Sequence, residues 1–434
     1  MDFAYALVTS LQHRLSRPLH PHWFSCAGQK STAGNFCPSL PLELWELVMD
    51  YNGDDLVSLR ACSLTCHAWV ARARTHLFRR ARISTSSPDL QSTTSLLTAS
   101  PAIAACIRHL TIDFGGADTL ADICAPLKRI CERFQSVQTL KLTRISMYAS
   151  LELSLLRTVL PKCTTHLELG KIAVTPQSPL PELISSFPVL RGLSLGDSLV
   201  SMHDTATWGA VGPVSARLRA PLRTLHLSLA FTNPSILNYV QWLVSVPNAL
   251  DLRTLSVAFD YSGTRINAPA LLGLLLENLC PPLDTLELAM TRDTDLSVMP
   301  FTLERATRLA NLRLLVRLSG SWTQDSPSHV RNWVATLLSR VHLPSIRTIH
   351  LAVEDPGEES YLFLDWVDDL VDAFSRYDLS GLIHITFECV GSPPETHAKE
   401  FMERRLGSLQ SKYQFEITTV KTSAAFGSDL MRTF

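Results

Sequence analysis

The sequence predicts an α/β chain in which a small module of three helices precedes an irregular solenoid of parallel strands backed by helices. Two observations lead to this fold class. Helical patterns are packed closely into residues 39–80, and beyond them a short leucine-rich pattern returns about every 31 residues. A chain of 434 residues is also too long for one ordinary core, so a domain followed by an array accounts for its length.

The expected organisation follows from where these patterns begin and end. We expect a disordered N-terminal tail over 1–38, the helical module over 39–80, a linker or first irregular repeat over 81–105, the array with its C-terminal cap over 106–422, and a tail over 423–434. Polar terminal elements close solenoids, and the end of the array has this character. A charged helix is predicted over 395–409 and a last strand over 412–420.

The first helix of the module is predicted from Ser39 to Tyr51. Ser39 can cap the helix, and Pro41 suits its first turn, where a missing N–H costs nothing. The helix ends at Asn52-Gly53, because glycine tolerates positive φ. The apolar residues of the helix recur with helical spacing and share one face: Leu44, Leu47, Val48 and Tyr51.

Two further helices complete the module. Asp54 or Asp55 can cap the second, and a third follows at once. Their apolar residues are Leu56, Leu59 and Cys62 in the second, and Cys66, Trp69, Val70, Ala73 and Leu77 in the third. Three short helices in about forty residues have a marginal core, so a module of this size usually depends on a partner.

These residues resemble the F-box motif, especially its fungal form. The resemblance rests on Leu40-Pro41-Leu42-Glu43-Leu44 and on the segment from Leu59 to Trp69. It implies a three-helix hook that binds the Skp adaptor of a cullin-based ubiquitin ligase. The adaptor contacts that it implies are Leu40, Pro41, Leu44, Val48, Leu59, Cys62, Leu64 and Trp69. We assign Leu47, Val70 and Leu77 to the module's own core.

The array is predicted from a pattern of the form apolar-x-x-apolar-x-apolar. Its copies begin at Ile107, Val137, Thr164, Leu190, Leu222, Leu252, Leu283, Leu312, Ile346 and Leu382. The alternation that closes each copy indicates a strand. Helical patterns separate the copies, at 120–134, 236–246, 270–279, 330–341 and 361–374. Strands and helices that alternate at a fixed period predict parallel strands with helices on one side.

The array resembles the leucine-rich repeat family, with one departure. The family's usual Asn or Cys, three residues after the last leucine, is missing. Other residues stand there, namely Ile145, Ser198, Ala230, Thr291 and Gly320 among others. Another arrangement must therefore support the turns, and the resemblance implies an irregular array whose curvature stays open.

The third and fifth residues of each copy are expected to face away from the leucine core. Candidate partner-binding residues at these positions are Lys141, Glu168, His226, Glu287, His350 and His384, with His109 and His166 on the same face. Solenoids commonly bind proteins through this side, although a merely solvated face is equally open at any one position. The histidines add the hypothesis that partner binding depends on pH.

Together these patterns favour a substrate-recognition subunit of a Skp–cullin–F-box ubiquitin ligase, with a Skp-type adaptor, a cullin and an unknown target protein as partners. We expect no catalytic residue, metal site or cofactor. One alternative is a repeat scaffold without a ligase role. Another is a serine hydrolase, because Gly192-Leu-Ser-Leu-Gly196 matches a nucleophile-elbow pattern around Ser194, although the repeat explains the same residues.

Composition bounds the partners and the compartment. The formal net charge is −1, from 39 basic and 40 acidic residues, which disfavours nucleic acid as a partner. No apolar run reaches the ~20 residues of a membrane span, so we expect no membrane insertion. The 10 cysteines are scattered as in a protein with free thiols, which predicts the cytoplasm or the nucleus.

Overall fold

The computed structural model describes the residues that form the principal helices and strands. They are 42–65, 67–115, 120–147, 156–174, 180–196, 199–200, 218–230, 242–245, 250–260, 275–277, 282–291, 306–317, 345–354, 371–372, 381–390, 403–404 and 414–420, with Gly273, Leu303, Phe374 and Gly407. The chain divides into two compact units. Unit 1 is Met1–Ile145 with Leu151–Thr164, and unit 2 is Ser146–Ser150 with Thr165–Phe434. The division falls inside the predicted array, so both units contain repeat strands.

Three short helices lie in unit 1 where the sequence predicts them. They are α2 (Leu42–Tyr51), α3 (Leu56–Thr65) and α4 (His67–Leu77). Asp55 caps α3, since its Oδ1 accepts the backbone N–H groups of Val57 at 3.0 Å and Ser58 at 3.2 Å. The three helices meet around a small core of Met49, Leu59 and Ala73, with Cys62, Trp69 and Leu77 packed against it.

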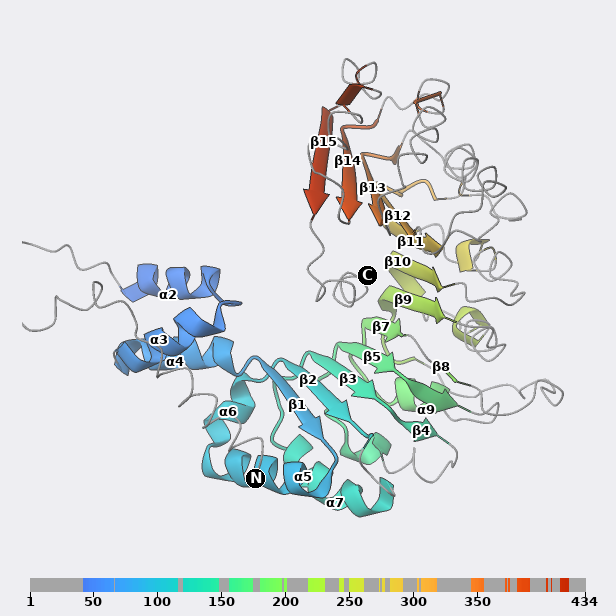
Figure 1. The fold of residues 1–434 in the computed structure, drawn as a ribbon. Coiled ribbons are helices and arrows are strands. Elements are labelled where there is room, and N and C mark those ends of the chain that lie inside the picture. Colours follow the sequence, from blue (N-terminus) through green and yellow to red (C-terminus); the bar gives the residue numbers. More distant parts are fainter. Residues whose placement is uncertain are drawn as a thin grey trace, which may run out of the picture. The chain divides into compact units, whose positions relative to one another are not determined.

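Unit 1 also contains three parallel strands, β1 (Arg80–Ser84), β2 (His109–Asp113) and β3 (Thr139–Thr143). The helices between them are α5 (Ser87–Ala99), α6 (Pro101–Cys106) and α7 (Leu120–Cys131), and Figure 1 shows α5 and α7 on the same side of these strands. Strand β1 comes from a copy of the repeat that sequence reasoning missed. Its Ala81 and Ile83 align with Leu110 and Ile112. Residues 80–106, predicted as a linker or a first irregular repeat, thus contain β1, α5 and α6.

Unit 2 carries the longer run of parallel strands. Its main sheet has the order β5 (His166–Gly170), β7 (Gly192–Leu195), β9 (Leu222–Ala230), β10 (Leu250–Asp260), β11 (Thr285–Thr291), β12 (Asn311–Arg317), β13 (Thr348–Glu354), β14 (His384–Val390) and β15 (Gln414–Val420). Each neighbouring pair is parallel. The pattern leucines of successive copies align in register and are buried, as Leu225, Leu255 and Leu286 illustrate. Helix α9 (Leu180–Ser185) lies between β6 (Ile172–Val174) and β7 in sequence. The α/β class and its repeated parallel strands are thus confirmed.

One predicted copy was placed three residues too late. The sequence reading begins it at Leu312, but Leu312 pairs in register with Leu286, the fourth residue of the preceding copy. The copy therefore begins at Leu309, which is also buried. The pattern agrees with this start, because a copy that began at Leu312 would place Arg317 at its last apolar position. Leu315 joins Ala258, Ala289 and Ala352 in a separate buried cluster.

A second small sheet stands where the family's asparagine would support the turns. It consists of β4 (Ser146–Met147), β6 (Ile172–Val174) and β8 (Leu199–Val200), which pair in parallel. The residues directly after β3 and β5, Arg144 and Lys171, have φ values of 59° and 54°. These left-handed residues turn the chain sharply after each strand, a conformation that costs a non-glycine residue free energy.

A buried carboxylate holds one of these turns in unit 1. Asp113, at the end of β2, is only 2% exposed. Its oxygens accept hydrogen bonds from Arg144 Nε and Nη2, both at 2.6 Å, from Arg82 Nη2 at 2.5 Å and from the Gly115 N–H at 3.2 Å. The Arg144 guanidinium, opposed by burial, holds the pKa of Asp113 well below its usual range.

The starts of β2, β3, β7, β9, β12, β13 and β14 are each held by a shared backbone acceptor. The carbonyl of the second residue in one copy accepts two consecutive N–H groups from the next copy. Thr165 O accepts from Arg191 and Gly192, and Arg347 O accepts from Ile383 and His384. Because only backbone atoms take part, the side chain at this second position makes none of these hydrogen bonds.

Several predictions lie outside the described residues. They are the tails 1–38 and 423–434 and the helix over 330–341. Within the predicted terminal helix, residues 403, 404 and 407 are helical, and β15 supplies the predicted last strand. No helix in the described ranges combines the length and the apolar character needed to cross a bilayer.

Candidate functional site

The helical module places the predicted adaptor contacts in three different environments. Leu40 and Pro41 lie outside the described residues. Leu44, Val48 and Leu64 are exposed, as a contact surface requires. Leu59, in contrast, is 1% exposed and belongs to the core, so its side chain offers no surface for a contact in this structure.

Cys62 and Trp69 are partly buried and pack against the core. The Trp69 ring also contacts Trp45 in a tilted arrangement, with ring centroids 4.8 Å apart. Both residues therefore contribute to the module's own packing, whatever contact they make beyond it.

Helix α2 turns its apolar face outward. Leu47, which we assigned to the core, is exposed, and Tyr51 is 92% exposed. Met49, on the other side of the helix, fills the core instead. Further large apolar side chains are exposed on α3, and we use the name apolar patch for the exposed apolar residues of the two helices: Leu44, Leu47, Val48, Tyr51, Leu56, Val57 and Leu64. On α2, four of them share one helical face, and monomeric proteins rarely leave such an apolar face in solvent unless it is an interaction site.

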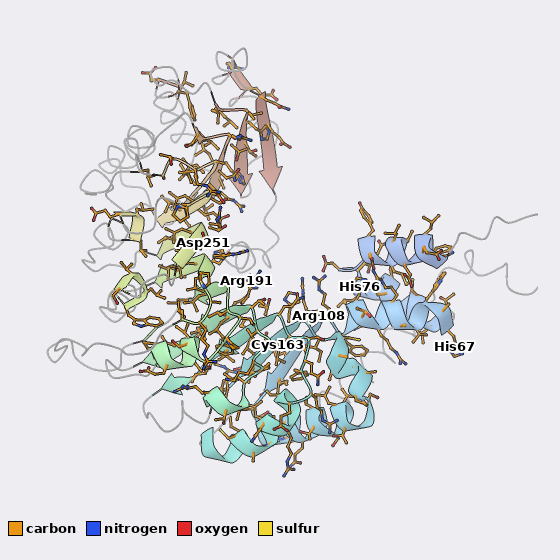
Figure 2. All side chains as sticks on the ribbon, turned by 180° about the vertical axis from the view of Figure 1, so that it is seen from behind. His67, His76, Arg108, Cys163, Arg191 and Asp251 are labelled. Atoms are coloured by element: carbon orange, nitrogen blue, oxygen red, sulfur yellow. The ribbon has the colours of Figure 1, made fainter. Side chains whose placement is uncertain are left out.

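Charged groups fix α2 against α4 and thereby orient the apolar patch. Asp50 on α2 accepts hydrogen bonds from Arg72 Nε at 2.6 Å and from Arg72 Nη2, and it lies 2.8 Å from His76 Nε2. His67 and His76 lie near opposite ends of α4 (Figure 2). The hydrogen bond from Arg72 lowers the pKa of Asp50 to about 2. Asp50 is therefore a carboxylate at any pH near neutrality.

The predicted partner-binding residues of unit 2 occupy two rows across the sheet. Glu168, His226, Glu287 and His350 lie in one register row, whereas His384 lies in the adjacent row, which contains the third residue of each copy. Lys141 belongs to unit 1.

This first row is recessed rather than projecting. Glu287 is 14% exposed, and Ser256 between His226 and Glu287 is buried. Burial lowers the pKa of His226, and the negative charge of Glu287 offsets this effect only in part. The histidine is therefore mostly neutral at pH 7. The row offers a partner fewer reachable groups than the sequence suggested.

Ser194 does not have the geometry of a hydrolase nucleophile. It lies inside β7, paired in register with Glu168 on one side and His226 on the other, and not at a sharp strand-to-helix turn. Gly192 has a packing reason, since a Cβ there would lie 2.3 Å from Cδ2 of His166. The motif is therefore explained by the repeat, as the sequence reading favoured.

Sequence reasoning missed the arginines that precede this face. Arg191, Arg223, Arg253 and Arg347 occupy the second position of their copies, and the recurring Leu-Arg-Thr wording was the available signal. Arg191, Arg223 and Arg347 are exposed. Figure 2 labels Arg191, next to β7, and Asp251 in β10.

Comparison of the chain with models of known families gave no match, and comparison with curated proteins gave none. The case for a function therefore rests on the residues and geometry described above.

Proposed function

We propose that residues 39–80 form an F-box-type module that docks on a Skp-type adaptor, and that the chain is the substrate-recognition subunit of a Skp–cullin–F-box ubiquitin ligase. The repeat strands would then hold the target protein. Such a subunit breaks and forms no bond. It acts by raising the effective concentration of the target's lysines near the ubiquitin carried by the rest of the assembly.

The observation that carries this proposal is the apolar patch. Its side chains are 43% to 92% exposed, although the module is small enough to need all its apolar residues for a core. Exposing Leu47, Leu64 and Tyr51 costs the free protein stability that burial against a partner would return. The sequence resemblance to the F-box motif, carried by the Leu-Pro opening and by Trp69, indicates which partner this is.

The structure also decides which substitutions test the proposal fairly. Trp69 packs against the core, so truncating it would weaken the module as well as a docking surface. Leu47 and Tyr51 are exposed on α2, so changing them leaves the core intact. The double variant Leu47→Lys/Tyr51→Ser is therefore the informative one. Leu96→Lys, which changes an exposed leucine of helix α5 in the same unit, is the matched control.

The experiment measures binding of the purified full chain to a purified Skp-type adaptor. Loss of two exposed apolar side chains is expected to weaken adaptor binding at least about 30-fold, since a single hot-spot side chain contributes about 2 kcal/mol. Leu96→Lys should bind as the unchanged chain does. Equal adaptor affinity for the double variant, or no adaptor binding by the unchanged chain at micromolar concentration, would contradict the proposal.

A further inference from the structure

Arginines gather along the edge of unit 2 where the strands begin. We call this the arginine strip, and it comprises Arg191, Arg223, Arg253, Arg308 and Arg347. Arg191 and Arg347 directly precede β7 and β13, Arg223 is the second residue of β9, Arg253 is the fourth residue of β10, and Arg308 lies three residues before β12. Shared backbone acceptors fix the starts of β7, β9, β12 and β13, so the repeat sets the spacing of the arginines near these strands.

Two aspartates lie within the strip and pair with its middle part. Asp251 lies 3.5 Å from Arg253 and 4.0 Å from Arg223, and Asp284 lies 3.2 Å from Arg253 and 3.4 Å from Arg308. Five guanidinium groups against two carboxylates leave the strip positive. Within the part of the chain that the structure describes, Arg191 and Arg347 at its two ends form no ion pair.

The guanidinium groups of the strip are open to solvent. Arg223, Arg253 and Arg308 are 52%, 38% and 53% exposed even though they are paired. Guanidinium groups form bidentate, charge-assisted hydrogen bonds with carboxylates, so the strip suits a partner rich in aspartate or glutamate.

Neutral hydrogen-bonding side chains run alongside the strip on the next register row. They are Thr224, Thr254, Thr285, Asn311 and Thr348. Asn311 donates to Thr285 at 3.3 Å and accepts from Thr348 at 2.7 Å. Such a row can hydrogen-bond the backbone of an extended chain laid beside the arginines.

The length of the strip sets the length of the segment that fits it. Neighbouring strands lie about 4.8 Å apart, so the five steps from β7 to β13 span about 24 Å. An extended peptide advances about 3.4 Å per residue, and seven or eight residues cover this distance.

We propose that the arginine strip of unit 2 binds an acidic, extended segment of the target protein, about seven or eight residues long. This inference rests on the proposed function, because it names the chemistry of the target that the repeat strands would hold. A polypeptide fits better than nucleic acid. Asp251 and Asp284 interrupt the strip and would repel a continuous phosphate backbone, whereas an acidic peptide can place neutral residues opposite them.

The test measures fluorescence anisotropy of a labelled ten-residue peptide of alternating glutamate and serine, titrated with the full chain. The variant Arg191→Glu/Arg347→Glu reverses the two ends of the strip without breaking a described ion pair. Arg157→Glu, an exposed arginine in unit 1, is the control of equal chemistry. We expect the double variant to bind the peptide at least about tenfold more weakly and with a smaller salt dependence, and the control to bind as the unchanged chain does.

Three results would overturn the proposal. They are equal peptide affinity for the double variant, no binding by the unchanged chain up to about 1 mM peptide, or tighter binding of a single-stranded DNA of similar charge that the double variant weakens equally. Adaptor binding is measured on the same samples. The double variant should keep it, so failure of the strip and failure of the docking module give different patterns.

Discussion

The assignment of Leu59 to the core can be tested by comparing it with Leu47 in the same module. Leu59→Ala removes a side chain that is 1% exposed and packs beside Met49 and Ala73. Buried leucine-to-alanine changes cost about 2 to 5 kcal/mol, because transfer free energy and a cavity add. A module of this size has only about 3 to 5 kcal/mol of stability, so a loss of about 3 kcal/mol would leave it marginally stable.

Amide hydrogen exchange of peptides covering α2 to α4 measures this change directly. A loss of about 3 kcal/mol raises the opening population, and with it the exchange rate, about 100-fold. Leu47→Ala should keep the exchange rate within about twofold of that of the unchanged chain, since Leu47 is 61% exposed. If Leu59→Ala keeps full protection and still loses adaptor binding, Leu59 is a contact residue and the core described above is wrong.

Two further perturbations test single contacts of the fold. The pKa of Asp113 is lowered in the folded chain, so its contribution to stability is present above the unfolded value of about 3.9 and is lost as pH falls below it. The free energy of urea unfolding of unit 1, followed by pulsed hydrogen exchange of β2 and β3, should therefore decrease between pH 4 and pH 2. In the variant Asp113→Asn this decrease should be smaller. Gly192→Ala should cost unit 2 about 1 kcal/mol, because the added methyl group meets His166. His166→Ala should remove most of that cost, and an undiminished cost in the double variant would mean that another neighbour opposes the methyl group.

The repeated part of the fold could be predicted because leucine spacing reports burial directly. Leu225, Leu255 and Leu286 align in register across neighbouring strands, as their identical sequence positions required. The copy at Leu309 was misplaced although a start at Leu312 puts Arg317 at the last apolar position, so the pattern itself already favoured Leu309. The small sheet of β4, β6 and β8 has two or three residues per strand, too few for any periodicity to appear.

The candidate surfaces could be predicted only in part, because spacing identifies a face but not what the face meets. The pattern of Leu44, Leu47, Val48 and Tyr51 showed one apolar stripe, and burial was the default inference for Leu47. The small core around Met49 has no room for that stripe, so it faces solvent. The recess of His226 depends on the neighbouring strands, which sequence spacing within one copy does not describe.

The shared backbone acceptor at each strand start has a consequence for how this protein can change over time. The residue that supplies the carbonyl is arginine at 191 and 347, threonine at 165, aspartate at 284 and alanine at 310. The carbonyl accepts two N–H groups from the next copy in each case. A mutation there changes one exposed side chain and keeps the backbone hydrogen bonds. Selection can therefore change which partner the array binds, one copy at a time, without a change in the fold.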